Sequence, residues 1–210
     1  MSEISMSVTS SSASTRRSLH TRRIECVGYE RSDGLFDIEG SMRDTKSSDA
    51  DLLFKTVPAG APLHDMRIVV TIDSKLVIRH IEAHTNASPS RFCTEINDAY
   101  RNLEGLSIGA GFMKEVKSRL TGPKGCTHLT ELLGPIATTA IQTLMSLRKT
   151  PSDPGESVDG KEADRVHPMA DTCYAWRAGG EVVQFATQRR RQMQQREAPT
   201  LDARHLQEER

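Results

Sequence analysis

The stretch MRIVVTIDSKLVIRHIEA, residues 66–83, decides the fold of this chain. β-branched residues fill much of both halves, and Asp73-Ser74-Lys75 between them is typical of a tight turn. The stretch therefore predicts two antiparallel strands, 66–72 and 76–83, joined by that turn. Apolar and polar residues alternate imperfectly over the second strand, which predicts one packed face and one polar face.

A second hairpin is predicted upstream of this one. Residues 22–30 and 35–44 have strand character, and the Asp33-Gly34 pair between them is a strong hairpin signal. The polar segment 45–61 is expected to cross to the next hairpin as a loop. Four antiparallel strands therefore precede any helix.

Three helices are expected after the strands. Ser88-Pro89 is typical of a helix start, and apolar residues then recur at helical spacing, which predicts a helix over 86–103. Further helices are predicted over 112–120 and 127–148, and Gly134-Pro135 is expected to bend or divide the last one. The expected fold class is α+β, with an antiparallel sheet of two hairpins covered on one face by about three helices.

Polar segments are expected at both ends of the chain, and a further polar segment separates the core from a short hairpin that follows it. The 210 residues suit one globular unit with tails. Segments that lack apolar residues are expected to be disordered or to act as linkers, because they bury too little surface to offset the entropy of ordering. The expected order is a disordered tail at 1–18, the core at 19–148, a linker or mobile loop at 149–168, a hairpin returning to the core at 169–186, and a polar tail at 187–210.

Composition argues against several classes of partner. The 28 basic residues balance 28 acidic ones, so no net charge attracts nucleic acid. The apolar runs are far shorter than a bilayer span, and the N-terminus is not typical of a signal peptide, so no membrane partner is expected. The four cysteines form no close pair, which favours reduced thiols. We expect a cytoplasmic protein.

The segment that begins with Cys126 contains the most reactive group of side chains. Gly-Pro-Lys-Gly precedes it, so the thiol lies at a helix start, where the helix dipole and Lys124 favour the thiolate. His128 and Glu131 share a helix face by their three-residue spacing. Cys126, His128 and Glu131 are therefore candidate catalytic residues, acting as nucleophile or ligand, base and orienting acid. The alternative is that Cys126 is only a packed small residue.

A metal site is a second possibility at the same place. A strand end and two helix starts often meet at one rim of a two-layer domain. There His84, Cys93, Cys126 and His128 would form a ligand set suited to zinc or iron. Residue His64 is followed by Asp65, but adjacent residues of an extended chain point to opposite faces, which argues against that pair.

Seven short motifs occur in order: Leu19-His20-Thr21-Arg22, Gly28-Tyr29-Glu30-Arg31, Asp33-Gly34, Asp37-Ile38-Glu39-Gly40, Asp44-Thr45-Lys46, Pro62-Leu63-His64-Asp65-Met66 and Gly125-Cys126-Thr127-His128-Leu129. Together they resemble a bacterial family, domain of unknown function 2889, over about residues 19–144 and more faintly over 171–183. This resemblance implies no particular reaction.

The order of elements also resembles the U-type iron-sulfur scaffold proteins at a distance. Strand 76–84, the segment 86–103 ending in Leu103-Glu104-Gly105, helix 112–120 and the helix that follows Cys126 are the corresponding pieces. This resemblance implies a scaffold-protein-like fold. The resemblance implies that one of the cluster-binding positions of the scaffold proteins has a counterpart in this chain, Cys126.

Three functions are compatible with these features. The first is a cytoplasmic enzyme of small-molecule catabolism that uses a Cys/His site on a small-molecule substrate, with or without assistance from zinc or iron. The second is a non-catalytic metal-binding or accessory module related to iron-sulfur scaffolds. The third is an adaptor whose polar ends recruit partners.

Overall fold

The computed structural model describes residues 14–147 and 170–197. The chain divides into two compact units, Met1–Leu147 and Arg148–Arg210, and each is described by itself. The expectations for the N-terminal tail up to residue 13, for the linker and for the last 13 residues lie outside the described residues. In the described parts of the chain, no helix has the length and apolar character needed to cross a bilayer.

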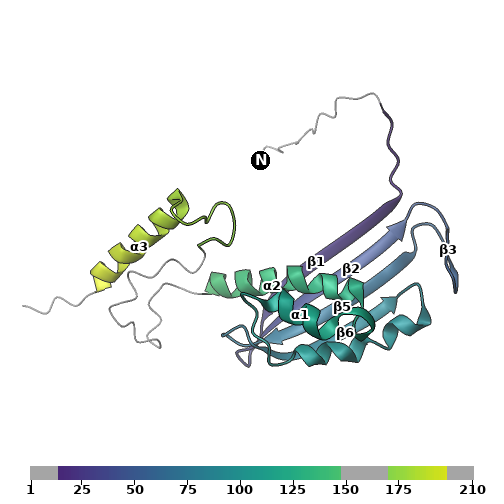
Figure 1. Cartoon of the computed structure of the whole chain (residues 1–210), viewed down its shortest axis with the longest axis horizontal. Coiled ribbons are helices and arrows are strands. Elements are labelled where there is room, and N and C mark those ends of the chain that lie inside the picture. Colours follow the sequence, from purple (N-terminus) through teal and green to yellow (C-terminus); the bar gives the residue numbers. More distant parts are fainter. Residues whose placement is uncertain (1–13, 148–169, 198–210) are drawn as a thin grey trace, which may run out of the picture. The chain divides into compact units, whose positions relative to one another are not determined.

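The first unit is built on a four-stranded antiparallel sheet, which confirms the predicted architecture (Figure 1). Its strands, in sheet order, are β1 (His20–Glu30), β2 (Phe36–Lys46), β5 (Pro62–Ile72) and β6 (Ile78–Ala87). Two short strands, β3 (Ala50–Asp51) and β4 (Thr56–Val57), pair within the crossing segment that was expected to be only a loop.

Both hairpin turns form where the sequence predicts them, and each has a local cause. At the first turn, Gly34 adopts a positive φ of 81°, and the Arg31 amide donates to the Leu35 carbonyl at 2.9 Å. At the second, the Asp73 carboxylate accepts from the amides of Lys75 at 2.8 Å and Val77 at 3.0 Å. The short turns make each strand pair antiparallel.

Helical elements cover one face of the sheet (Figure 1). They are the 3₁₀ turns η1 (Arg91–Thr94), η2 (Asn97–Leu103) and η3 (Gly122–Lys124), and the helices α1 (Phe112–Leu120) and α2 (Thr127–Leu147). Helix α2 runs on through Pro135, so Gly134-Pro135 does not divide it.

The continuous helix expected over 86–103 is replaced by a longer strand and two short 3₁₀ turns. Strand β6 continues to Ala87, and Ser90 instead of Ser88 caps the first turn by accepting from the Phe92 amide. Thr, Asn and Asp residues interrupt this segment, and their side chains compete with helical backbone hydrogen bonds. Thr94 shows this competition directly, since its hydroxyl donates to the Arg91 carbonyl at 3.1 Å.

Helix α2 packs closely on the sheet because two strand glycines leave room for it. A Cβ atom on Gly40 would lie 2.6 Å from the Ile136 side chain, and one on Gly28 would collide with Thr143. The core between the layers contains fully buried residues from both, including Ile38 and Ile68 of the sheet and Leu132 of α2. Burial of this apolar surface is the main force that holds helix and sheet together.

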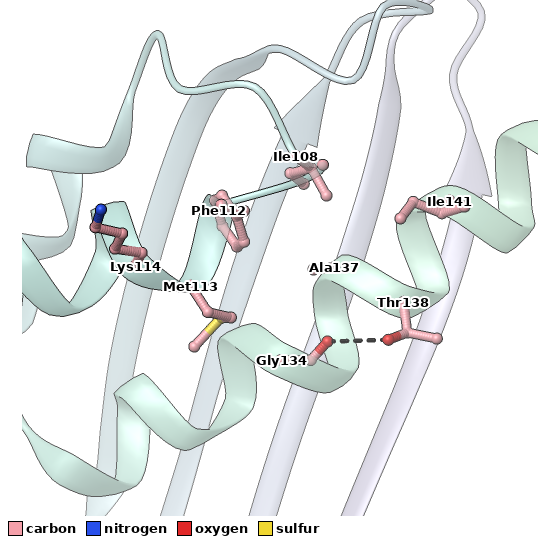
Figure 2. A pocket seen from close by; sticks show the side chains of 10 residues that line it. Ile108, Phe112, Met113, Lys114, Gly134, Ala137, Thr138 and Ile141 are labelled. Carbon is pink, nitrogen blue, oxygen red and sulfur yellow. Dashed lines mark hydrogen bonds between the residues drawn. The ribbon is translucent and has the colours of Figure 1, made fainter. Parts of the chain in front are cut away.

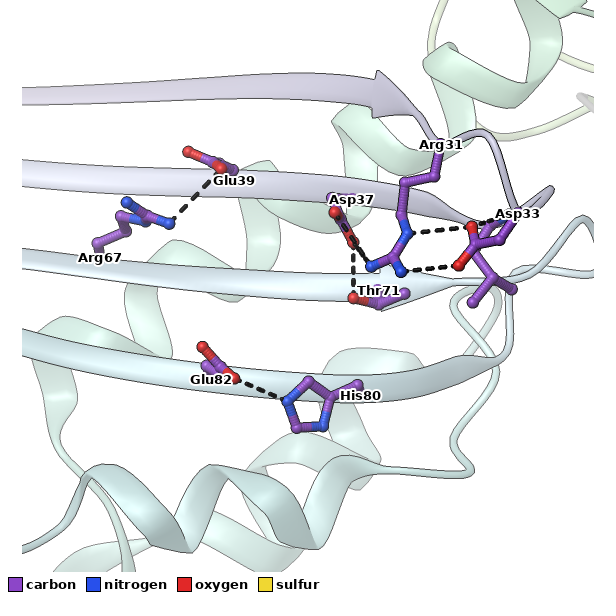
Figure 3. A network of polar contacts seen from close by, with 9 residues as sticks. Arg31, Asp33, Asp37, Glu39, Arg67, Thr71, His80 and Glu82 are labelled. Atoms are coloured by element: carbon purple, nitrogen blue, oxygen red, sulfur yellow. Dashed lines mark hydrogen bonds and ion pairs between the residues drawn. The ribbon is translucent and has the colours of Figure 1, made fainter.

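The other face of the sheet is polar, as the alternation predicts (Figure 3). Thr71 donates to Asp37 at 2.6 Å across β5 and β2, and His80 lies 2.9 Å from Glu82 on β6. Arg67 pairs with Glu39 at 3.5 Å. These contacts are exposed or half-buried, which is typical of the solvated side of an antiparallel sheet.

The second unit contains helix α3 (Glu181–Glu197), and not the hairpin expected over 169–186. Residues 170–180 form turns, and the Gln184 amide donates to the Gly180 carbonyl at 3.1 Å as the helix begins. Val182 and Val183 favour a strand, but Gln, Arg, Ala and Glu dominate the residues that follow and favour a helix. The helix-favouring residues outnumber the two valines, and the segment is helical.

Candidate functional site

A row of three polar side chains crosses the packed face of the sheet at one end. Arg22 of β1 lies opposite Asp44 of β2, and Asp44 lies opposite His64 of β5. Asp44 is fully buried and His64 is 6% exposed. Burying a polar group costs free energy unless the group is paired, so a row of polar residues on a packed face is unusual. The row is therefore a candidate functional site.

Asp44 is the centre of the row. Its two carboxylate oxygens accept from Arg22 Nε at 2.8 Å and from Nη2 at 2.7 Å, a two-pronged ion pair. Oδ2 also lies 3.0 Å from His64 Nδ1, and Oδ1 lies 3.6 Å from His20 Nε2. The hydrogen bonds from Arg22 hold the pKa of Asp44 below its usual value, so the carboxylate is ionised.

Helix α2 completes the site from above the sheet. His128, in its first turn, stacks on His64 with ring centroids 3.8 Å apart and an interplanar angle of 31°. Glu131 accepts from Arg22 Nη1 at 2.5 Å. Arg22 therefore joins a carboxylate of the sheet to one of the helix, and this fixes the first turn of α2 over the polar row.

The two stacked histidines are neutral near pH 7. Burial lowers the pKa of His64, and the neighbouring His128 lowers it further. Burial also lowers the pKa of His128, with a contribution from the positive charge of Arg22. Because Nδ1 of His64 lies against the Asp44 carboxylate, that nitrogen carries the proton and Nε2 has a free lone pair.

Tyr100 of η2 positions Cys126 at the start of α2. The buried hydroxyl accepts from the Cys126 amide at 3.2 Å and donates to the Cys126 carbonyl at 2.8 Å. Thr130 Oγ1, 2.9 Å away, can donate to the same oxygen. The Cys126 Sγ atom then lies 4.0 Å from His128 Nδ1, at the outer limit of a hydrogen bond to sulfur.

His64, Cys126 and His128 line a pocket of about 630 Å³, which we call the rim pocket. Its lining residues are His64, Pro89, Phe92, Cys93, Glu95, Ile96, Pro123, Gly125, Cys126, Thr127 and His128. Phe54, between β3 and β4, packs edge-on against Phe92 with centroids 6.0 Å apart. The rim pocket therefore combines apolar walls with two imidazoles and two thiols, a mixture typical of a small-molecule site.

A second hollow of about 500 Å³ lies between α1 and α2 (Figure 2). Phe112, Met113 and Ile141 contribute apolar surface to it, and Thr138 donates within the helix to the Gly134 carbonyl at 3.3 Å. Among the described residues that line it, Lys114 alone carries an ionisable side chain. With no acid and base side by side, this hollow is a poor candidate for catalysis.

The structure brings together three of the five residues singled out from the sequence. Cys93, Cys126 and His128 line the rim pocket. Glu131 lies nearby, but its partner is Arg22. His84 is on the opposite, open face of the sheet, where its Nε2 lies 3.5 Å from Glu82. It points away because its neighbour Ala83 packs against the core.

Sequence reasoning missed Arg22, Asp44 and the true partner of His64. The neighbour Asp65 points to the open face, where it accepts from Asn86 at 3.1 Å, while His64 pairs one strand away with Asp44. A signal was present: His64 shares its strand face with the buried Met66, and Asp44 shares its face with the buried Met42. A polar residue in phase with buried apolar ones indicates a buried polar site.

Asp44, His64 and His128 also form a group that could hold a metal ion. Each offers one ligand atom, and these atoms all lie within 4.8 Å of one another. A carboxylate and two neutral imidazoles are ligands suited to zinc or iron.

The class of protein is thus an α+β domain in which a buried Asp44-His64 pair and a half-buried His128 lie together beside a pocket. Residues 20–142 match a family described as protein of unknown function (DUF2889), and the chain belongs to this family. Every residue of the polar row and of the rim pocket lies inside the matched range. No curated protein and no solved structure matches the chain significantly.

Proposed function

We propose that this protein is a cytoplasmic enzyme of small-molecule catabolism whose substrate binds in the rim pocket. One observation carries the proposal: His64, which contacts the buried Asp44 carboxylate through Nδ1, lies against His128 at the surface of a pocket of about 630 Å³. Pockets of this size enclose small organic molecules. The proposal therefore concerns proton transfer to or from such a molecule.

His64 is suited to act as the base. Asp44 accepts from Nδ1, which leaves the Nε2 lone pair to take a proton, and the carboxylate then stabilises the imidazolium that forms. Arg22 keeps Asp44 ionised and fixed in position, so it is a positioning residue. His128 is the second group able to accept or return a proton in the same pocket.

Cys126 offers a nucleophile beside this pair. Its Sγ atom lies 4.0 Å from His128 Nδ1, so a small side-chain movement would let the imidazole take the thiol proton. Covalent chemistry at Cys126 and simple proton transfer at His64 make different predictions. Replacing Cys126 with serine abolishes the first and spares the second.

The state of the cysteines supports a cytoplasmic location. All four, Cys26, Cys93, Cys126 and Cys173, are free thiols. Free thiols persist in a reducing compartment. The balanced charge of the chain likewise supports a small molecule, and not nucleic acid, as the partner.

The test is the consumption of small molecules by the purified full chain. The protein would be incubated with a bacterial metabolite extract, and mass spectrometry would follow compounds that disappear and appear with time. We expect turnover by the wild type and its loss in His64→Gln. The matched control is His84→Gln, which changes a histidine on the open face and should turn over like the wild type. Equal turnover by His64→Gln, or none by the wild type, would refute the proposal.

A second candidate is the accessory module related to iron-sulfur scaffolds. It is favoured by the presence of Cys93 and Cys126 on the wall of one pocket. Anaerobic reconstitution with iron and sulfide tests it, since a bound cluster gives visible absorption that Cys126→Ser should abolish.

A further inference from the structure

We infer that Asp44, His64 and His128 bind one divalent transition metal ion, zinc or iron(II), at the rim pocket. This inference rests on the proposed function only in placing the chemistry at the same pocket, and metal binding can be measured without any substrate.

The spacing of the donor atoms supports a single ion. All three ligand atoms lie within 4.8 Å of one another, and Asp44 Oδ2 is 3.0 Å from His64 Nδ1. Two donors that each bind zinc at about 2.0–2.2 Å lie roughly 3 to 3.5 Å apart around the ion. Asp44 Oδ2 and His64 Nδ1 already have this separation, and an ion between them would displace the proton that Nδ1 carries in the metal-free pair. The third donor is on His128, a half-buried side chain whose ring can rotate.

The donor groups are of the kind that bind zinc or iron(II), namely one carboxylate and two imidazoles. The carboxylates of Asp44 and Glu131 flank the single guanidinium of Arg22. The group of ion pairs therefore has one more carboxylate than cation, which favours a bound dication.

Arg22 does not block the site. Each carboxylate oxygen of Asp44 has two lone pairs, so an oxygen that accepts from Arg22 can also bind a metal. Glu131 holds the guanidinium from the other side and keeps it in place. Arg22 would therefore orient the ligating carboxylate, a role that outer partners commonly have at metal sites.

The three ligands would leave part of the coordination sphere open toward the rim pocket. Three protein ligands with an open position are typical of catalytic zinc sites, and two histidines with one carboxylate are typical of non-haem iron(II) sites. When bound, the ion would lower the pKa of a bound water and could polarise a substrate oxygen. An ion on His64 Nδ1 would place the ring proton on Nε2, so metal content also decides whether His64 itself is the base.

The experiment uses the full chain purified without a metal-affinity tag. Elemental analysis gives the metal content as isolated, and Co²⁺ titrated into chelator-treated protein gives a visible spectrum that reports protein-bound ion. We expect about one ion per chain and saturable Co²⁺ binding for the wild type. His128→Ala should weaken Co²⁺ binding by at least about 100-fold, more than the loss of an outer partner typically costs. The control His84→Ala should bind as the wild type does.

Circular dichroism checks that His128→Ala is folded, and Asp44→Asn, which keeps the side-chain shape, provides a second ligand variant. No saturable Co²⁺ binding by the wild type would overturn the inference, and so would equal binding by folded His128→Ala and Asp44→Asn. A Co²⁺ site in a protein that consumes no metabolite would leave the inference standing and refute the enzyme proposal. Turnover by a wild type that shows no saturable Co²⁺ binding would do the reverse.

Discussion

Arg22 and Asp44 lie directly opposite each other on β1 and β2, and two hydrogen bonds of 2.8 and 2.7 Å join the guanidinium to the carboxylate. The pair neutralises a charge that would otherwise be buried alone under α2. It also fixes α2 relative to the sheet, because the same guanidinium binds Glu131 of α2. The stability of the domain and the geometry of the histidine pair therefore depend on one side chain.

Replacing Arg22 with methionine should be strongly destabilising. The change leaves the Asp44 carboxylate buried without a cation, and we expect a loss of about 2–4 kcal/mol in the free energy of unfolding. The value is below the upper range for buried pairs because the Arg22 side chain is 32% exposed. Urea denaturation followed by circular dichroism measures it.

The matched control is Arg67→Met on the open face. Arg67 lies 3.5 Å from Glu39, and both side chains are exposed, so the loss should stay below about 1 kcal/mol. Equal losses for the two variants would show that Asp44 does not depend on Arg22.

Tyr100→Phe should loosen the start of α2. The change removes a buried hydroxyl that serves the amide and carbonyl of Cys126 and the hydroxyl of Thr130, and we expect a loss of about 1–3 kcal/mol. Hydrogen exchange should become faster at the Cys126 amide in particular. Tyr29→Phe, at a tyrosine that is 48% exposed, is the control and should leave that exchange rate unchanged.

The fold could be predicted from the sequence because its signals are local. The Asp33-Gly34 and Asp73 turns each fix a strand pair by their own backbone chemistry. The segment after β6 was harder, since the apolar spacing of a helix is present there but Thr, Asn and Asp side chains divide it into 3₁₀ turns. The spacing of apolar residues determines which face of the segment is buried. The side chains that compete for backbone hydrogen bonds determine whether it forms one α-helix or several 3₁₀ turns.

The site was only partly predictable because its partners lie on different strands. Cys126 and His128 are close in sequence, so their neighbourhood could be read directly. Asp44 and His64 are 20 residues apart, and they meet only through the register of β2 with β5. Register is set by the turns and by the packing of the whole face, so it does not follow from either motif alone.

Gly40→Ala should reduce stability by creating overlap between sheet and helix. The new Cβ atom would lie 2.6 Å from the Ile136 side chain, and we expect a loss of about 1–3 kcal/mol. Adding Ile136→Val shortens the clashing side chain and should recover part of the loss, which thermal or urea unfolding would show. Gly109→Ala, where a Cβ meets no atom within 4 Å, is the control. A Gly40→Ala variant as stable as this control would contradict the close packing.

The pKa of His80 should lie above the ordinary value for histidine, and the pKa of His64 should lie below it. His80 lies on the open face between two carboxylates, Glu82 at 2.9 Å and Glu104 at 3.0 Å, and the hydrogen bond to Glu82 raises its pKa above 6.5. Burial lowers the pKa of His64 below 6.5. Imidazole signals followed by NMR across the pH range measure both values in one sample.

The sign of the effect on stability follows from the raised pKa of His80. A histidine whose pKa is higher in the folded state contributes fully below its unfolded value, near 6.5. This contribution is lost as the pH rises through the folded value. Glu104→Gln removes one carboxylate partner, so it should lower the pKa of His80 and leave that of His64 unchanged. If His80 titrates below 6.5 in the wild type, its ion pairs with Glu82 and Glu104 do not form in solution. If its pKa does not respond to Glu104→Gln, the pair with Glu104 does not form.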